Sequence, residues 1–395
     1  MYTIENLGRR LQVIQGLQWL YGAEGDEYAT LLRGYEEDPL PVYEQVRERG
    51  SLWRSRLGPW VTAHHGVAAE LLDHPGLGAR RADGSSAVGS VLPLDEAFFG
   101  LERAHVDRLR AAMASALPSD VADRAAQACE RVLGRTDDDF DLINDVVTRV
   151  TVDQLADLFG LPARARDRLA DACLATSIAL DGQLCPQQLV RTQRMFEAIE
   201  DLRQLFGPEA TGAAVLGETL APPDIQALGV LLAVAGARTA IVLAGNAVLA
   251  LLEHPTEWNR LVEEPERAHR AVRETLRYAP PVQVHAVVAH TDLECEGQQI
   301  EAGSQVALLI AAANRDSGVF AAPDRFDPDR VTSQAELLEA GLLHEVVGPL
   351  ARAHAEGIVR AMATCLPGLR RTGHPLWSRR APVTRGLLRL PVGKS

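Results

Sequence analysis

The residues that could do chemistry begin with His344 and Glu345, which open the zinc-site pattern H-E-x-x-H. That pattern needs a second histidine one helical turn later, and Gly348 stands there instead. Residues 76–81 start a G-x-G-x-x-G pattern but end in arginine, where a dinucleotide site needs glycine. Lys394 is the single lysine, so Schiff-base and P-loop chemistry have no candidate amine. We therefore predict no metal site and no catalytic residue of these kinds.

The acidic composition limits the partners that the chain can bind. Its 395 residues carry 40 lysines and arginines against 53 aspartates and glutamates, a formal charge of −13. Nucleic acids and anionic membranes attract basic surfaces, so neither is an expected partner. The five cysteines are scattered without a C-x-x-C pair, and the N-terminus has no signal-peptide pattern. We expect a cytoplasmic protein with free, buried thiols.

Helical spacing of apolar residues dominates the chain and predicts a mainly α structure. Strand-like patterns occur in residues 51–65, with a turn near Gly58, and in residues 285–310, where they predict two or three strands. No repeat or long linker interrupts this pattern. We expect one domain over residues 1–395, mainly α with small β-sheets.

Residues 227–252 are apolar apart from three polar side chains, one of which is Arg238. The segment is long enough to span a bilayer. An arginine near the centre of a membrane helix costs about 2.5–3.5 kcal/mol, however. We therefore expect a buried central helix and no membrane.

Glu274 and Arg277 lie three residues apart in a helix that ends before two prolines. Such a pair alone is usually a surface ion pair worth a few tenths of a kcal/mol. It is followed here by strand-like residues, by N-R-D at residues 314–316, and by A-P-D-R-F-D-P at residues 322–328. This order resembles the cytochrome P450 superfamily. Residues 38–43 and 251–255 are similar to further segments of that family, so the resemblance covers most of the chain.

The resemblance implies a buried network of Glu274, Arg277 and Arg325, the last being the arginine of P-D-R-F. Two guanidinium groups around one carboxylate satisfy many hydrogen-bond donors. Removing one member of a buried ion pair costs about 3–5 kcal/mol. We expect this network to determine the fold and to take no part in catalysis.

The positions that carry the family's chemistry differ in this chain. A glycine-rich loop of the family presents a cysteine thiolate to the haem iron, and that cysteine's place falls on Glu345 here. The loop glycines are absent, and residues 333–340 are mostly good helix formers. In the family's oxygen-activation pattern, Thr239 is retained but the acid is replaced by Arg238. The resemblance thus implies a P450-like fold that lacks the haem-binding loop: a pseudoenzyme with no cofactor and no catalytic residue.

One branch of the superfamily resembles the whole pattern, including residues 8–34 ahead of the usual entry segment. It comprises the P450-like auxiliary proteins of bacterial macrolide and related polyketide antibiotic pathways. These proteins partner glycosyltransferases that attach amino-deoxysugars from nucleotide diphosphate forms. The resemblance implies that this chain binds, stabilises and activates such a glycosyltransferase, while the partner catalyses sugar transfer.

Residues 1–37 form an N-terminal extension that we expect to contribute to partner binding. A helix there would carry one apolar stripe with two further apolar residues beside it. These residues are Leu11, Ile14, Leu17 and Tyr21 in the stripe, with Trp19 and Leu20 beside it. The alternative is that this helix packs on its own domain, as most amphipathic helices do.

Three further hypotheses concern the place of the lost haem. Arg238 is expected to occupy that space and to pair with a carboxylate, because an unpaired buried guanidinium is costly. His344 could instead be an unusual proximal ligand, which would make the chain a divergent haem protein or monooxygenase. A third possibility is a non-catalytic protein that binds an aglycone in the old substrate pocket.

Overall fold

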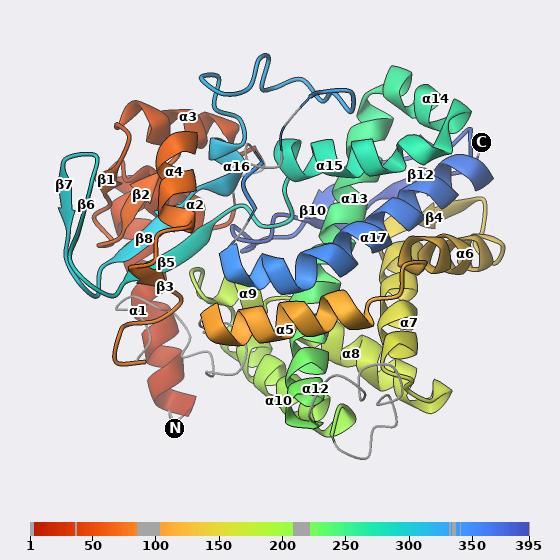
Figure 1. The fold of residues 1–395 in the computed structure, drawn as a ribbon, viewed down its shortest axis with the longest axis horizontal. Helices are drawn as coiled ribbons and strands as arrows, with labels where there is room; N and C mark the ends of the chain where they lie inside the picture. The colour runs from red at the N-terminus through yellow and green to blue at the C-terminus, as the bar shows by residue number, and fades with distance from the viewer. Residues whose placement is uncertain are drawn as a thin grey trace.

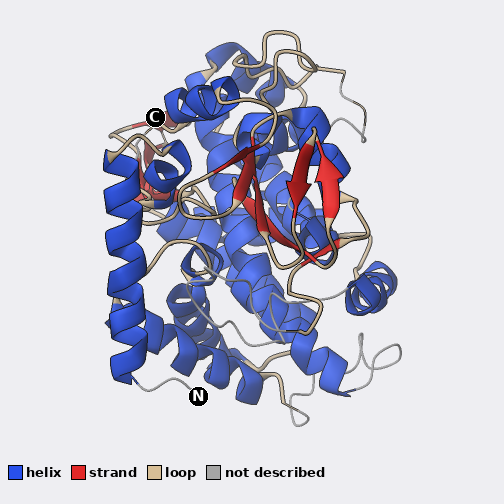
Figure 2. Ribbon diagram, turned by 90° about the vertical axis from the view of Figure 1, so that its left-hand side faces the viewer, coloured by secondary structure: helices blue, strands red, loops and turns tan. Residues whose placement is uncertain are grey.

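The computed structural model describes residues 4–35, 38–84, 103–207, 222–331, 333, 337–339 and 341–394. Helices make up most of this part, and the strands gather in small sheets (Figures 1 and 2). The mainly α architecture with small β-sheets is therefore confirmed.

A long central helix runs through the middle of the molecule (Figure 1). It consists of α12 (Pro222–Leu231), a π-helical turn η3 (Leu232–Gly236) and α13 (Ala237–Glu253). The run Asp224–Glu253 is long and apolar enough to cross a membrane, but 83% of its most apolar window is buried inside the protein. It is the buried central helix that the apolar run at residues 227–252 predicts.

The other helical elements surround this centre. They are α1 (Ile4–Ala23), α2 (Glu27–Leu32), α3 (Leu40–Glu48), α4 (His65–Leu72), α5 (Arg103–Ala116), α6 (Val121–Leu133), η1 (Leu142–Val147), α7 (Thr148–Leu158), η2 (Ala163–Ala165), α8 (Arg166–Thr176), α9 (Ala179–Gly182), α10 (Leu189–Leu205), α14 (Pro255–Glu263), η4 (Pro265–Arg267), α15 (Ala268–Tyr278), α16 (Ile310–Ala313) and α17 (Gly341–Cys365). The helix α17 packs against α5, α6 and α13 (Figure 1).

The largest sheet has the strand order β1-β2-β8-β5-β3. Its strands are β1 (Trp53–Arg54), β2 (Trp60–Thr62), β3 (Leu77–Gly78), β5 (His285–Ala289) and β8 (Gln305–Leu308). The pair β2–β8 is parallel and the other pairs are antiparallel. Gly58 forms the expected turn between β1 and β2 at a φ of 109°, which an L side chain rarely adopts.

Residues 285–310 hold four strands, more than the two or three that the sequence pattern predicts. The additional pair is a short hairpin of β6 (Leu293–Cys295) and β7 (Gln298–Ile300). Its turn residues Glu296 and Gly297 have φ angles of 52° and 71°, the primed turn geometry that suits two-residue hairpins. The remaining strands are β4 (Asp139–Asp141), β9 (Arg370–Arg371), β10 (Leu376–Trp377), β11 (Leu387–Arg389) and β12 (Pro391–Gly393), which form the sheets β4-β12-β9 and β10-β11.

Candidate functional site

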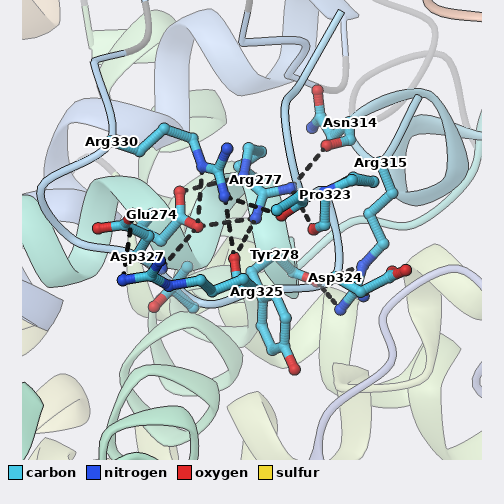
Figure 3. Close-up of polar contacts among 12 residues, drawn as sticks. Glu274, Arg277, Tyr278, Asn314, Arg315, Pro323, Asp324, Arg325, Asp327 and Arg330 are labelled. Atoms are coloured by element: carbon cyan, nitrogen blue, oxygen red, sulfur yellow. Dashed lines mark hydrogen bonds and ion pairs between the residues drawn. The ribbon is translucent and has the colours of Figure 1, made fainter. Parts of the chain in front are cut away.

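Glu274 and Arg277 form a buried, bidentate ion pair on α15 (Figure 3). Arg277 Nε donates to Glu274 Oε2 at 3.0 Å, and Arg277 Nη2 donates to Glu274 Oε1 at 2.7 Å. The same guanidinium also donates to the carbonyl oxygens of Asn314, Pro323 and Arg325 at 2.8–3.0 Å. It thereby ties α15 to the irregular segment that follows α16. The hydrogen bonds of the Arg277 guanidinium all go to buried or main-chain groups of the same domain, which is typical of a structural role.

Arg325, which the sequence places in this network, contributes its main chain but not its side chain. Its side chain is 67% exposed and lies 3.8 Å from the carboxylate of Asp327. Arg330 takes the expected place, with Nε 3.4 Å from Glu274 Oε1 and only 12% of its side chain exposed. Arg277 and Arg330 both donate to the carbonyl oxygen of Arg325 (Figure 3). The Arg325 main chain thus faces the network while its side chain extends to solvent, which corrects the sequence prediction.

Asn314 extends the network toward α17, a role that the sequence analysis missed. Its side-chain amide donates to the carbonyl of Leu338 at 2.8 Å, and the N–H of Leu338 donates back to Asn314 Oδ1 at 3.0 Å. Leu338 lies three residues before α17 begins. The N-R-D pattern at residues 314–316 was the signal that could have pointed to this anchor.

Glu345, at the place of the family's thiolate, lies inside α17. The helix begins at Gly341 and contains Pro349 in its interior. Proline has no N–H, so the usual helical donor for the Glu345 carbonyl is missing. The Glu345 side chain reaches the surface, where Arg110 Nη1 donates to its Oε2 at 2.8 Å. A surface carboxylate in a helix does not present a soft ligand to an iron atom.

The central helix and α17 pack directly against each other, at the place where the resemblance puts the family's haem. A Cβ atom placed on Gly236 would lie 3.8 Å from the Cβ of Val347, two residues after Glu345. Glycine has no Cβ atom, so this distance shows that the space beside Gly236 has room for about one methyl group, whereas a planar macrocycle between the two helices would separate their carbons by roughly 7–8 Å. Val346 and Val347 belong to the same buried core as residues 230–235. The residues at these positions therefore do not fit a haem.

A cavity of about 90 Å³ remains beside this contact, lined in part by Thr239, His285 and His344. Burial lowers the pKa of His285 to about 4, so its imidazole is neutral at physiological pH. The Nε2 atom of His344 pairs with the carboxylate of Glu339. Burial raises the pKa of Glu339, but His344 and Arg352 lower it by more, so the group is held ionised. His344 thus has a protein partner at Nε2, and nothing in its contacts favours an iron ligand.

Arg238 lies on the other side of the central helix and does not fill the haem space, contrary to the sequence hypothesis. It is two residues from Gly236, about 200° around the helix. Its Nε donates to Thr384 Oγ1 at 3.2 Å, and Nη2 donates to the Thr384 carbonyl at 3.2 Å and to Ser378 Oγ at 3.4 Å. The expected carboxylate is Asp181, whose Oδ2 accepts from Thr384 Oγ1 at 2.5 Å. Thr384 therefore bridges the two charges, which also interact electrostatically.

The four residues of the N-terminal stripe and the two beside it differ in their burial. Leu11 is buried in the core and Ile14 packs against that core. Leu17, Trp19 and Leu20 are exposed by 39–52%, and Tyr21 is half-buried. The inward face of α1 continues instead through Gln18, whose amide donates to the carbonyl of Leu184 at 2.8 Å. The helix thus packs on its own domain with one face and leaves an apolar face in solvent.

Comparisons with known proteins agree with this architecture. A family model described as Cytochrome P450 matches residues 200–338. Protein AknT of Streptomyces galilaeus is 38% identical, over all of this chain and 97% of that protein. Protein DesVIII of Streptomyces venezuelae is also 38% identical, over 98% of this chain and 94% of that protein. The Cytochrome P450 family protein EryCII of Saccharopolyspora erythraea is 32% identical, over 98% and 97% of the two chains.

Solved structures are similar over nearly the whole chain. Ligand-free CYP164A2 of Mycobacterium smegmatis superposes with a TM-score of 0.78 at 27% identity, covering 93% of this chain and 99% of that one. Epothilone D-bound cytochrome P450epoK gives a TM-score of 0.78 at 25% identity, covering 92% and 97%. The full-length relatives and these likenesses cover almost the whole chain and agree on its fold. The chain belongs to the cytochrome P450 family.

Proposed function

We propose that this protein is a haem-free, non-catalytic auxiliary partner of a glycosyltransferase that uses nucleotide-diphosphate deoxysugars in a polyketide antibiotic pathway. It binds the glycosyltransferase in the cytoplasm, stabilises it and activates it, and the partner carries out the sugar transfer. The whole chain, residues 1–395, acts as one domain, with residues 1–37 contributing to the partner interface.

The observation that carries the proposal is the packing of α17 on the central helix, where Val346 and Val347 share one buried core with residues 230–235. It joins the two helices that would otherwise flank a haem, and it coincides with a helical Glu345 in place of a ligand loop. Arg238, a base in place of the relay acid, is engaged by Thr384 and Ser378. The position of the iron ligand, the space for the haem and the acid of the proton relay therefore all differ from the family's pattern. The Glu274–Arg277 pair that supports the fold is present.

The pattern of similarity supports the auxiliary role. The relatives matched at 38% identity over almost the full chain, Protein AknT and Protein DesVIII, are not named as cytochromes. A relative named Putative cytochrome P450 140 is 28% identical over 96% of this chain. The sequence as a whole, including residues 8–34, resembles the auxiliary branch of the family.

The partner surface that we propose is the outer face of α1, defined as Val13, Leu17, Trp19, Leu20 and the adjacent Tyr35. All five side chains are exposed. The Trp19 and Tyr35 rings lie 5.9 Å apart, and the Arg33 guanidinium stacks over Trp19 at 4.6 Å, so the aromatic residues are held in position. Aromatic and arginine side chains held in this way are typical anchors of protein interfaces.

The first experiment is the visible absorption spectrum of the protein purified from cells supplied with excess haem, followed by co-purification with the pathway's glycosyltransferase. We expect no Soret band, a stable complex, and sugar transfer that depends on the complex. One haem per chain would overturn the haem-free proposal and direct attention to His344. A haem-free protein that neither binds nor stimulates the glycosyltransferase, but binds the aglycone directly, would overturn the partner role and support an aglycone-binding protein.

The partner surface is tested with a Leu17→Ala, Trp19→Ala, Leu20→Ala triple variant. We expect at least a tenfold loss of affinity for the glycosyltransferase with only a modest change in thermal unfolding, since about half of each of these side chains is in solvent. Val331→Ala is the control, because Val331 is fully exposed and far along the chain. Undiminished affinity of the triple variant would remove the outer face of α1 from the proposal.

A further inference from the structure

A second cavity, of about 440 Å³, lies on the side of α13 that faces away from α17. Its wall is built from η1, α8, α9, α10, α13 and the β10–β11 sheet. Arg238 and Ile241 line it from the central helix. Its volume lies within the roughly 300–1,000 Å³ typical of small-molecule sites. The space beside Thr239 is a separate and much smaller cavity of about 90 Å³.

The charges that line this cavity are predominantly positive. Arg191, Arg238, Arg379 and Arg380 are in its wall, and Asp181 is the single carboxylate among the described lining residues. Both oxygens of Asp181 are already engaged, because the N–H groups of Val383 and Thr384 donate to Oδ1 and the Thr384 hydroxyl donates to Oδ2. One carboxylate among four guanidinium groups leaves most of the positive charge without a counter-charge among the described lining residues.

Two of these arginines have donors to spare. Arg238 uses Nε and Nη2 in hydrogen bonds, whereas Nη1 donates to none of the described residues. Arg191 is exposed and makes no ion pair within the described part of the chain. Desolvation lowers the pKa of Arg238, Asp181 raises it, and the nearby Arg191 lowers it further. An anion placed between Arg191 and Arg238 would satisfy their free donors and reduce their mutual repulsion.

Much of the remaining wall is apolar and partly open to solvent, although Asn144, Ser177 and Gln187 also line it. Leu174, Leu376 and Leu388 line the cavity and rank among the most exposed large apolar side chains of the described chain, at 69%, 46% and 50%. Trp377 adds an aromatic surface. A ligand that covered these side chains would gain roughly 25 cal/mol for each Å² of apolar surface removed from water.

We propose that this cavity binds a small organic anion, consisting of an apolar or aromatic body with one carboxylate, whose acidic group lies between Arg191 and Arg238. The site is on the opposite side of α13 from the closed haem position. It is therefore distinct from any remnant of the old haem pocket. The proposal does not depend on the auxiliary role, because it rests on the wall of this cavity alone.

The test uses three probes with one aromatic body: 1-naphthylacetate, 2-(1-naphthyl)ethanol and 2-(1-naphthyl)ethylamine, titrated into the full-length protein by isothermal calorimetry. We expect the acid to bind about tenfold or more tightly than the alcohol, as a charge-assisted hydrogen bond predicts, and the amine to bind most weakly. The preference for the acid should weaken at high salt.

Arg191→Gln and Arg238→Gln should each reduce the affinity for the acid severalfold and leave the affinity for the alcohol unchanged. Arg194→Gln is the matched control, because Arg194 is one turn further along α10, pairs with Glu197 and does not line the cavity. If Arg238→Gln fails to fold, the exposed Arg191 carries the test. Equal binding of acid and alcohol, no binding of the acid, or an affinity for the acid that Arg191→Gln leaves unchanged would overturn the proposal.

Discussion

The buried network predicts which arginines stabilise the fold. Replacing Arg277 by methionine removes two hydrogen bonds to Glu274, at 3.0 and 2.7 Å, and three to main-chain carbonyls. Glu274 would remain buried, with the N–H of Asp327 at 3.0 Å and the more distant Arg330 as its partners. Stranding a buried charge in this way costs about 3–5 kcal/mol in the free energy of unfolding.

Arg330→Met and Arg325→Met provide the matched comparison within the same loop. Arg330 is largely buried and donates to Glu274 and to the carbonyls of Ala322 and Arg325, so we expect a loss of about 1–3 kcal/mol. Arg325 is 67% exposed with one long ion pair, so its replacement should change stability by less than about 0.5 kcal/mol.

Urea unfolding followed by circular dichroism, with linear extrapolation to water, measures all three losses. The expected order of destabilisation is Arg277→Met, then Arg330→Met, then Arg325→Met. The reasoning is refuted if Arg325→Met destabilises as much as Arg330→Met, because the exposed side chain would then contribute what we assign to the buried one.

Three further predictions follow from particular contacts. Glu345→Cys, purified with excess haem, should still show no Soret band, because α17 packs on the central helix beside this residue. A Soret band would mean that only the ligand had been lost. Gly357→Ala should lower the free energy of unfolding by about 1–3 kcal/mol, because its Cβ would overlap the main chain of α6 at Ala122. Alanine favours helices, so a variant that is stabilised in urea unfolding would contradict this packing. Burial lowers the pKa of His354 to about 4, below the unfolded value of about 6.5. The free energy of unfolding should therefore fall by about 3 kcal/mol as the pH drops from 6.5 to 4. His354→Leu should reduce this dependence of stability on pH. An identical slope in His354→Leu would remove His354 as its cause.

The pairing of Glu274 and Arg277 could be predicted because both residues lie on one helix with a spacing that brings them together. Which arginine side chain, Arg325 or Arg330, lies beside Glu274 could not be predicted. Both lie in an irregular segment, and the choice depends on which way the Arg325 carbonyl points. Sequence spacing carries no information about that orientation.

The face of α1 that packs inward could be only partly predicted from apolar spacing. Leu11 and Ile14 face the core, as their types suggest. The next inward position is Gln18, which is buried because its amide finds the carbonyl of Leu184, a residue 166 positions away. A polar residue at that position shifts the apparent stripe toward Leu17 and Tyr21. Pattern analysis therefore misassigned the phase of the helix by one residue.

The cavity around Arg238 could not be predicted from the sequence at all. The replacement of the relay acid is visible in the chain, but Arg191, Asp181 and Thr384 come from segments up to about 200 residues apart. Only the packing of α9 and of the segment after β10 against the central helix brings these charges together. Hydrogen bonds to such distant groups follow from the topology, which local spacing does not specify.

The retained network has a structural use even without a haem. Arg277 holds the Asn314 carbonyl, and the Asn314 side chain fixes the main chain of Leu338 immediately before α17. These bonds hold the main chain three residues before α17 begins, and Val346 and Val347 of α17 in turn share a buried core with residues 230–235 of the central helix. Because protein interiors are close-packed, an emptied cofactor site must be filled by side chains or it destabilises the core. In the haem-free protein that we propose, the network therefore also supports the helix that packs on the central helix, which gives a physical reason for its presence there.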